Sequence, residues 1–477
     1  MKHLFGLIIM LLSALVTQAG TLTVQGTAPD YKGEIIKLFQ YDDLLTERLS
    51  IIDNTIVDEE DGSFAFTVEI DEIQPLLLRI GTVNCRFYGT PDKDYQLTFM
   101  SLPEDVPMLI NYSNYVPPKF EGLDTTDINY LTVDFDYRFR NFMQRHAYDI
   151  AQKRGKDYVL SFAQKLDTVY ANVENPYFLE YYNYSVASLK FMVNISKKKV
   201  YEAHLKGRKV NYHQPVFFEF IETFFENAVQ EIYFWRGAEV VEKAIAKDQN
   251  VDLLFEAMDK SDFLKEDEQL KELVMIVGLR DLYYENTFKL QDVEKLILQI
   301  SKKGKYEENR NIASNLYEKI IKNRKGYPAP NIAMKTLKGD DFDLEELKGK
   351  MVYIQFFASW CKPCLKELFV MKDVYEEYYP MVEFVSISID DHEADAKAFA
   401  DQYNIPWTVI HQGYDDELRY LYDVLSVPAY FLLDEEGKFM KSYTPTPEEN
   451  IERIFRRIKS DREEEMKREK NKDFIKE

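Results

Sequence analysis

Residues 356–369 read FFASWCKPCLKELF, and they place two cysteines, Cys361 and Cys364, two residues apart. Only one other cysteine, Cys85, occurs in the 477 residues of the chain. The apolar run MVYIQFF at 351–357 comes just before the pair and is typical of a central parallel strand with both faces covered. Because a helical pattern follows the pair, the cysteines are expected at a junction between a strand and a helix.

The predicted position of Cys361 favours a reactive thiol. The first backbone N–H groups of a helix lack partners and attract an anion, and the thiolate is the attacking form of cysteine. Lys362 adds a positive charge, and Pro363 suits a first helical turn, where its missing N–H costs little. Cys364 lies almost one turn further on and is expected to be less exposed. We therefore predict that Cys361 attacks a substrate disulfide and that Cys364 resolves the mixed disulfide.

A C-x-x-C pair can also be half of a zinc site, which needs two further ligands at suitable spacing. The chain has no second C-x-x-C, and its histidines form no H-x₃₋₅-H pair. Neither a metal nor a cofactor is therefore expected. Three cysteines cannot form the set of disulfides that stabilises a disulfide-rich fold. The pair is therefore predicted to take part in a reaction rather than to hold the structure together. Cys85 is expected to be a buried, inert thiol, as most free cysteines are.

Strands and helices alternate around the cysteine pair. After it the pattern predicts a strand at 382–389, helices at 393–403 and 416–424, a strand at 429–433 and a hairpin through Glu436-Gly437. This order is typical of an α/β domain with right-handed crossovers. We expect the domain to span 326–462, with a last helix starting at Thr446, and to be followed by a solvated charged tail at 463–477.

Two different patterns precede this domain. Residues 20–115 contain short alternating runs such as SFAFTVEI at 63–70, and they predict an antiparallel β-sandwich. From 120 to 325 apolar residues recur three and four apart while glycine and proline become scarce, which predicts an all-α helical domain. The expected fold class is therefore multi-domain, with a β-sandwich, a central helical domain and a C-terminal α/β domain.

Residues 1–19 have the layout of a secretory signal peptide, with a basic residue at position 2, a short apolar run and small residues before Gly20. Retention of this segment as an anchor is the alternative. The chain is expected to be exported and periplasmic, with membrane association left open. Its net charge of −22 argues against a nucleic-acid partner, because phosphate neutralisation needs clustered lysines and arginines.

The motifs around the cysteines resemble those of exported thioredoxin-like proteins of the TlpA/ResA type. The resemblance covers about 326–460. It is carried by ASWCKPC at 358–364, the preceding GDDFDL and KGK segments, NIPWTVI at 404–410 and SVPAYFLLDEEGK at 426–438. It implies a thioredoxin-like fold and thiol–disulfide oxidoreductase activity. More loosely, DGSFAF and QLKELVMIVGLRDLYYE resemble a β-sandwich domain of unknown function and a helical region that precede such domains in other exported bacterial proteins.

The resemblance implies roles for further residues. Pro428 would be in the cis form and face the disulfide, with backbone groups of Val427 open to an incoming chain, and Trp360 would shield one side of the thiol. Glu367 either lies near the thiols and tunes them or is an exposed first-turn glutamate that complements the helix dipole. One position departs from thioredoxins proper: Gln355 stands where they carry a buried acid, and it cannot exchange a proton.

The predicted function is reduction of disulfides in exported proteins, with electrons from a membrane-embedded thiol reductant that the resemblance implies. The alternative is a binding or scaffold protein of the cell envelope, whose thioredoxin-like domain docks or regulates. A peroxidase of related fold is disfavoured, because that chemistry usually places a single reactive cysteine elsewhere in the fold.

Overall fold

The computed structural model describes residues 20–474 except 82, 103–113, 286, 391, 413–416, 425 and 442–443. The expected signal peptide at 1–19 lies outside the described residues. Among the described helices, none combines the length and the apolar composition that a membrane crossing requires.

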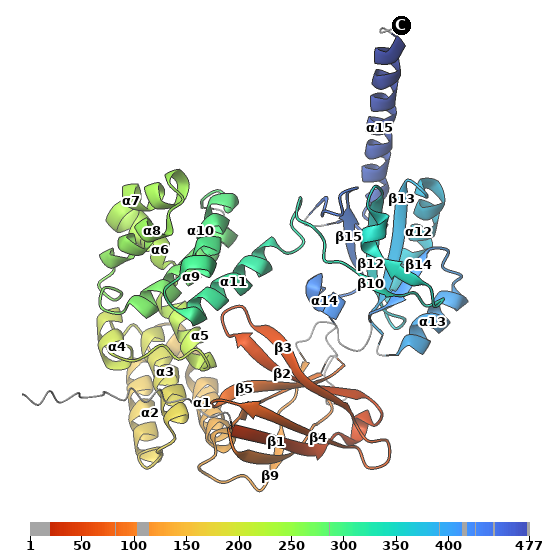
Figure 1. Cartoon of the computed structure of the whole chain (residues 1–477). Coiled ribbons are helices and arrows are strands. Elements are labelled where there is room, and N and C mark those ends of the chain that lie inside the picture. The colour runs from red at the N-terminus through yellow and green to blue at the C-terminus, as the bar shows by residue number, and fades with distance from the viewer. Residues whose placement is uncertain are drawn as a thin grey trace, which may run out of the picture.

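Strands of the N-terminal region form two sheets around one core (Figure 1). One sheet has the order β4-β1-β7-β9 and consists of β1 (Gly20–Thr27), β4 (Ser63–Ile70), β7 (Lys93–Thr98) and β9 (Lys119–Glu121). The other has the order β3-β2-β5-β6-β8 and consists of β2 (Ile35–Asp43), β3 (Arg48–Ile56), β5 (Gln74–Ile80), β6 (Val83–Gly89) and β8 (Asn114–Tyr115). Side chains of β4 alternate between buried and exposed as its sequence predicts.

The prediction of a purely antiparallel sandwich ending at 115 is wrong in two details. β1 pairs with β7 in parallel, and so does β6 with β8. Strand β9 lies beyond the expected boundary and pairs with β7. The prolines at 117 and 118 resemble the end of a domain in sequence, but the chain resumes the sheet directly after them.

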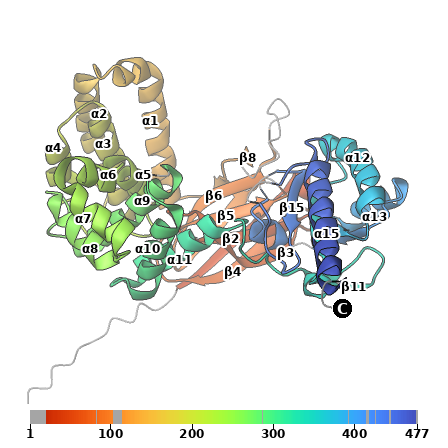
Figure 2. The same ribbon diagram turned by 90° about the horizontal axis from the view of Figure 1, so that it is seen from above.

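Eleven α-helices lie in the described part of 120–325. They are α1 (Ile128–Ala151), α2 (Lys156–Val169), α3 (Pro176–Met192), α4 (Lys197–His204), α5 (Pro215–Phe224), α6 (Ala228–Ile232), α7 (Ala238–Glu242), α8 (Val251–Ala257), α9 (Glu268–Glu285), α10 (Leu290–Lys303) and α11 (Glu307–Ile321). Those from Pro176 onward share one large core, and the first two pack with the third in two smaller clusters. Seen from above, the strands of the β-region lie between these helices and the C-terminal unit (Figure 2).

The C-terminal unit is built on a four-stranded sheet in the order β14-β13-β12-β15. Its strands are β12 (Met351–Phe357), β13 (Val382–Ser388), β14 (Thr408–His411) and β15 (Ala429–Leu433), preceded by the β10 (Ala333–Lys335) and β11 (Asp341–Asp343) hairpin. Its helices are α12 (Lys362–Tyr378), α13 (Glu393–Gln402), α14 (Glu417–Leu421) and α15 (Ile451–Phe474). β12 pairs in parallel with β13 and antiparallel with β15, and all seven of its residues are buried. These observations confirm the predicted central strand.

The last helix differs from the prediction at both ends. It begins at Ile451 rather than Thr446, because the hydroxyl of Thr446 accepts the backbone N–H of Glu449 in a turn that precedes the helix. It also continues through most of the segment expected to be a separate tail, and the ribbon of α15 extends away from the sheet (Figure 1).

Cys85 and His204 are among the titratable side chains of the first two regions whose pKa values are strongly shifted. The thiol of Cys85 on β6 is fully buried, and burial raises its pKa to about 12. His204 is also buried, and its ring nitrogens lie 2.8 Å from Oδ1 of Asn183 and 3.2 Å from Nζ of Lys190. An ammonium can only donate, so the ring is neutral in this arrangement. Burial, followed by the positive charges of Lys190 and Arg208, lowers the pKa of His204 to about 4.

We expect Cys85 to resist alkylation in the native protein, because its thiolate is scarce and the core covers it. The measurement is mass spectrometry after treatment of the reduced protein with iodoacetamide, with and without urea. Cys85 should be modified only in urea. Modification of Cys85 in the native protein at the rate seen in urea would contradict its burial.

Stability should fall as the pH is lowered toward 4. The unfolded His204 takes up a proton near 6.5, whereas the folded side chain does so only near 4, so the unfolded state binds more protons in this window. The loss begins as the pH falls through 6.5 and is complete below 4. Urea denaturation across this range is the measurement. His204→Gln should flatten the slope, and Lys190→Met should flatten it in part. An unchanged slope in His204→Gln would refute this assignment.

Candidate functional site

The two cysteines lie where β12 ends and α12 begins, as predicted. Cys361 is the N-cap residue of α12, and its Sγ is bonded to Sγ of Cys364 with the Cα atoms 5.2 Å apart. Pro363 occupies the first turn of the helix, where a missing N–H is tolerated. The strand, which is buried along its whole length, fixes the place at which the loop leaves the sheet.

The start of α12 offers a hydrogen-bond donor to the first sulfur. The backbone N–H of Cys364 lies 3.1 Å from Sγ of Cys361, so one of the unpaired N–H groups of the helix points at this atom. In the reduced protein the same donor and the positive end of the helix dipole favour a thiolate at Cys361 over one deeper in the helix. This arrangement can support nucleophilic attack by Cys361.

Val427 lies against the disulfide, and Pro428 follows it. The peptide bond between them is cis, and the carbonyl oxygen of Val427 is 3.6 Å from Sγ of Cys361. Both cysteines are almost buried in the disulfide form, at 3% exposure for Cys361 and 1% for Cys364, so the expected contrast between them is small. Trp360 next to the pair is 51% exposed and therefore accessible to another molecule.

Glu367 is buried, which contradicts the interpretation as an exposed first-turn glutamate. The side chain is only 7% exposed, and its carboxylate accepts the backbone N–H of Glu448 at 3.0 Å. The charge of this carboxylate is felt at Tyr430, whose pKa is raised mainly by burial and then by Glu367. Glu367 therefore lies on the buried face of α12, one turn beyond Cys364.

Gln355, in the place of the buried acid of thioredoxins, is held by hydrogen bonds at both ends of its amide. Its Nε2 donates to the hydroxyl of Tyr430 at 3.0 Å, and its Oε1 accepts from the hydroxyl of Ser386 at 2.9 Å. The indole N–H of Trp407 in turn donates to Ser386 at 2.8 Å. This buried chain of neutral groups is structural and offers no carboxyl group for proton exchange.

Asp390 and Ser359, which the sequence analysis did not single out, meet at the loop that carries the cysteines. Asp390 follows β13, and its carboxylate accepts hydrogen bonds from the backbone N–H and the hydroxyl of Ser359. The sequence signal for this contact is an acid just after the apolar run of a buried strand, since parallel strands end at the same edge of a sheet. In the described residues no group of three or more metal-ligating side chains of the histidine, cysteine, aspartate and glutamate types is present.

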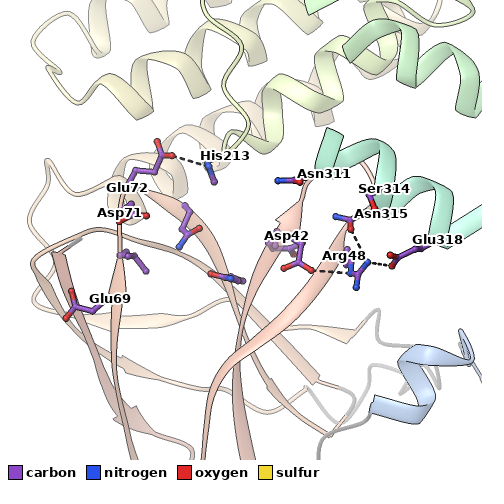
Figure 3. A pocket seen from close by; sticks show the side chains of 14 residues that line it. Asp42, Arg48, Glu69, Asp71, Glu72, His213, Asn311, Ser314, Asn315 and Glu318 are labelled. Carbon is purple, nitrogen blue, oxygen red and sulfur yellow. Dashed lines mark hydrogen bonds and ion pairs between the residues drawn. The ribbon is translucent and has the colours of Figure 1, made fainter. Parts of the chain in front are cut away.

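A separate groove of about 640 Å³ lies between the β-region and the helices. Figure 3 shows Arg48 on β3 between Asp42 and the α11 residues Asn315 and Glu318, with Glu72 facing His213 on the other side. All of its lining residues come from the first two regions, so it is not part of the cysteine site.

Comparisons with known proteins agree with the geometry of the C-terminal unit. Residues 326–442 match the AhpC/TSA family. The thioredoxin-like protein YneN of Bacillus subtilis is 33% identical over 132 residues, which is 26% of this chain and 75% of that protein. The thiol-disulfide oxidoreductase ResA of Bacillus thuringiensis is 32% identical over 136 residues, which is 28% of this chain and 78% of that protein.

Among solved structures, the thioredoxin domain of a thiol-disulfide oxidoreductase from Bacteroides vulgatus is 25% identical, with a TM-score of 0.26. The match covers 27% of this chain and 94% of that one. The family match at 326–442 lies within the C-terminal unit and leaves the first two regions outside it. Through this unit the chain belongs to the family of thioredoxin-like, ResA-type thiol–disulfide oxidoreductases.

Proposed function

We propose that this protein reduces disulfides of exported proteins through Cys361 and Cys364. The observation that carries the proposal is the Cys361–Cys364 disulfide at the amino end of α12, next to Val427 and Pro428. In the reduced form the Cys361 thiolate attacks a substrate disulfide, which forms a mixed disulfide and releases one substrate thiolate. The Cys364 thiolate then attacks Sγ of Cys361 and releases the second substrate thiolate. Two electrons pass to the substrate, and this protein becomes oxidised.

Return to the reduced form requires a dithiol that transfers two electrons to the Cys361–Cys364 disulfide. We infer a membrane-embedded thiol reductant in the cell envelope for this role. The signal-peptide pattern of residues 1–19 supports export to the periplasm. The direction of electron flow depends on the reduction potential of the pair against that of its partners.

The residues around the pair receive distinct proposed roles. Val427 would offer backbone groups to an incoming extended chain, and Pro428 would keep that surface against the disulfide. The exposed indole of Trp360 would contact the substrate, because a half-exposed aromatic ring beside a reactive atom adds apolar contact area. Glu367 would exchange a proton with Cys364. Its burial and its place one turn beyond Cys364 support this role.

We further propose three units: a β-sandwich at 20–115 extended by β9, a helical unit up to 325 and the redox unit at 326–462. The C-terminal unit has a hydrophobic core of its own, which supports its division from the rest, whereas Leu45 of the β-region packs into the core of the helices. The second candidate function, an envelope binding or scaffold protein, is favoured by the polar groove between the first two units. In that case the redox unit would regulate or dock rather than act on a free substrate.

Cysteine variants separate these functions. Insulin reduction by the wild type should fall by at least about a hundredfold in Cys361→Ser, because the attacking sulfur is lost. Cys364→Ser should accumulate mixed disulfides with its substrates, since the resolving thiol is missing, and mass spectrometry of the trapped species identifies them. Cys85→Ser, which leaves the pair intact, is the control. Wild-type protein without any disulfide reduction, together with partner binding retained in Cys361→Ser, would favour the scaffold.

Glu367→Gln tests the proposed proton exchange at Cys364. The amide can still accept the N–H of Glu448 but cannot release a proton, so resolution of the mixed disulfide should slow by about tenfold and lose part of its pH dependence. Single-turnover kinetics from about pH 5 to pH 9 provide the measurement. Glu376→Gln, an exposed glutamate on the same helix, is the matched control. Identical pH profiles in both variants and the wild type would exclude Glu367 from proton exchange.

A further inference from the structure

The carboxylate of Asp390 holds the loop that leads to the cysteine pair. Its Oδ1 lies 2.9 Å from the backbone nitrogen and 2.7 Å from the hydroxyl oxygen of Ser359, and its Oδ2 lies 3.1 Å from the same nitrogen. Oδ2 also accepts the hydroxyl of Ser388 at 2.6 Å. The side chain is buried at 3% exposure, and hydrogen bonds to a charged acceptor in such an interior are strong.

Asp390 is itself fixed by the sheet. Phe357 at the end of β12 is paired with Ser388 at the end of β13, so the residues after both strands leave the sheet side by side. The backbone N–H of Asp390 donates to the hydroxyl of Ser388 at 3.0 Å, and Nε2 of His411 lies 2.7 Å from its carbonyl oxygen. The carboxylate therefore reaches Ser359 from a backbone held on both sides.

The constrained segment ends at the reactive sulfur. Ser359 lies two residues before Cys361, and the backbone N–H of Cys361 donates to the carbonyl of Ala358 at 3.1 Å. A hydrogen-bonded turn thus connects the residue that Asp390 holds to the N-cap of α12. When the disulfide is reduced, the bond between the two sulfurs no longer limits Cys361, and this turn remains as a constraint on its position.

The geometry points to Asp390 as a positioning residue that, through Ser359, keeps Cys361 aligned with the amino end of α12 and with Val427 for attack on a disulfide. This inference depends on the proposed function. It assigns no contact between Asp390 and the reacting atoms. The effect is on the fraction of time that the thiolate has the correct orientation, which contributes directly to the rate of a bimolecular attack.

Asp390→Asn provides the direct test, because the amide keeps the shape but presents an N–H₂ group to donors that need an acceptor. The reduced variant should react with oxidised glutathione about tenfold more slowly than the wild type, which corresponds to loss of one hydrogen bond to a charged group. The midpoint of its pH–rate profile should also move. Ser359→Ala should show a smaller loss of about threefold, and Ser359→Thr, which keeps a hydroxyl, should restore most of the rate.

Ser388→Ala and Ser386→Ala form a matched pair for the same measurement. Both serines are fully buried on β13 and hydrogen-bonded through their hydroxyls, but only Ser388 contacts Asp390. The Ser388 variant should slow the reaction, and the Ser386 variant should lower stability in urea without a comparable loss of rate. If Asp390→Asn fails to fold, the serine variants still decide the question.

The inference is overturned if the Asp390, Ser359 and Ser388 variants all react with oxidised glutathione at the wild-type rate with an unchanged pH profile. In that case the cluster only stabilises the fold. A wild-type protein that reduces no disulfide would instead refute the proposed function. The two failures are therefore distinguishable in one set of experiments.

Discussion

The site depends on one hydrogen bond, from the backbone N–H of Cys364 to the sulfur of Cys361. This hydrogen bond forms only if Cys361 is the N-cap of a helix. Cys361 has that position because the buried strand β12 ends four residues before it, at Phe357. The free energy that places the sulfur therefore comes from the apolar core of the C-terminal unit rather than from the loop. The geometry of this one hydrogen bond is thus set by the packing of a core whose residues are far apart in the sequence.

The polar groups near the pair fall into two sets with different physical properties. The neutral chain of Gln355, Ser386 and Trp407 is buried and satisfied, so it fixes side-chain positions at little electrostatic cost. Asp390 and Glu367 are buried carboxylates, each held by backbone N–H groups. Burial of a charge is tolerated only with such partners. The unit thus carries one buried carboxylate that contacts the loop before Cys361 and another on α12 beyond Cys364, apart from the neutral chain of Gln355.

Patterns within single segments predicted much of this structure. The apolar run of β12 and the proline after Cys361 were enough to predict the strand–helix junction, and ResA-type motifs indicated the partner loop at Pro428. Contacts between segments were not predictable. The hydrogen bonds between Asp390 and Ser359 join residues 31 positions apart, and the burial of Glu367 depends on the turn at Glu448. The parallel pairing of β7 with β1 likewise depends on how distant strands meet.

The two ion pairs of Arg48, one to Asp42 within the β-region and one to Glu318 on α11, behave differently from the redox centre toward dissolved salt. Arg48 is 31% exposed, and its partners Asp42 and Glu318 are 29% and 54% exposed, so mobile ions can screen these attractions. The covalent bond and the buried contacts around Cys361 are shielded from such screening. A rise in ionic strength therefore weakens the attraction of Arg48 to Glu318 across the groove more than it weakens the buried contacts of the sulfur atoms.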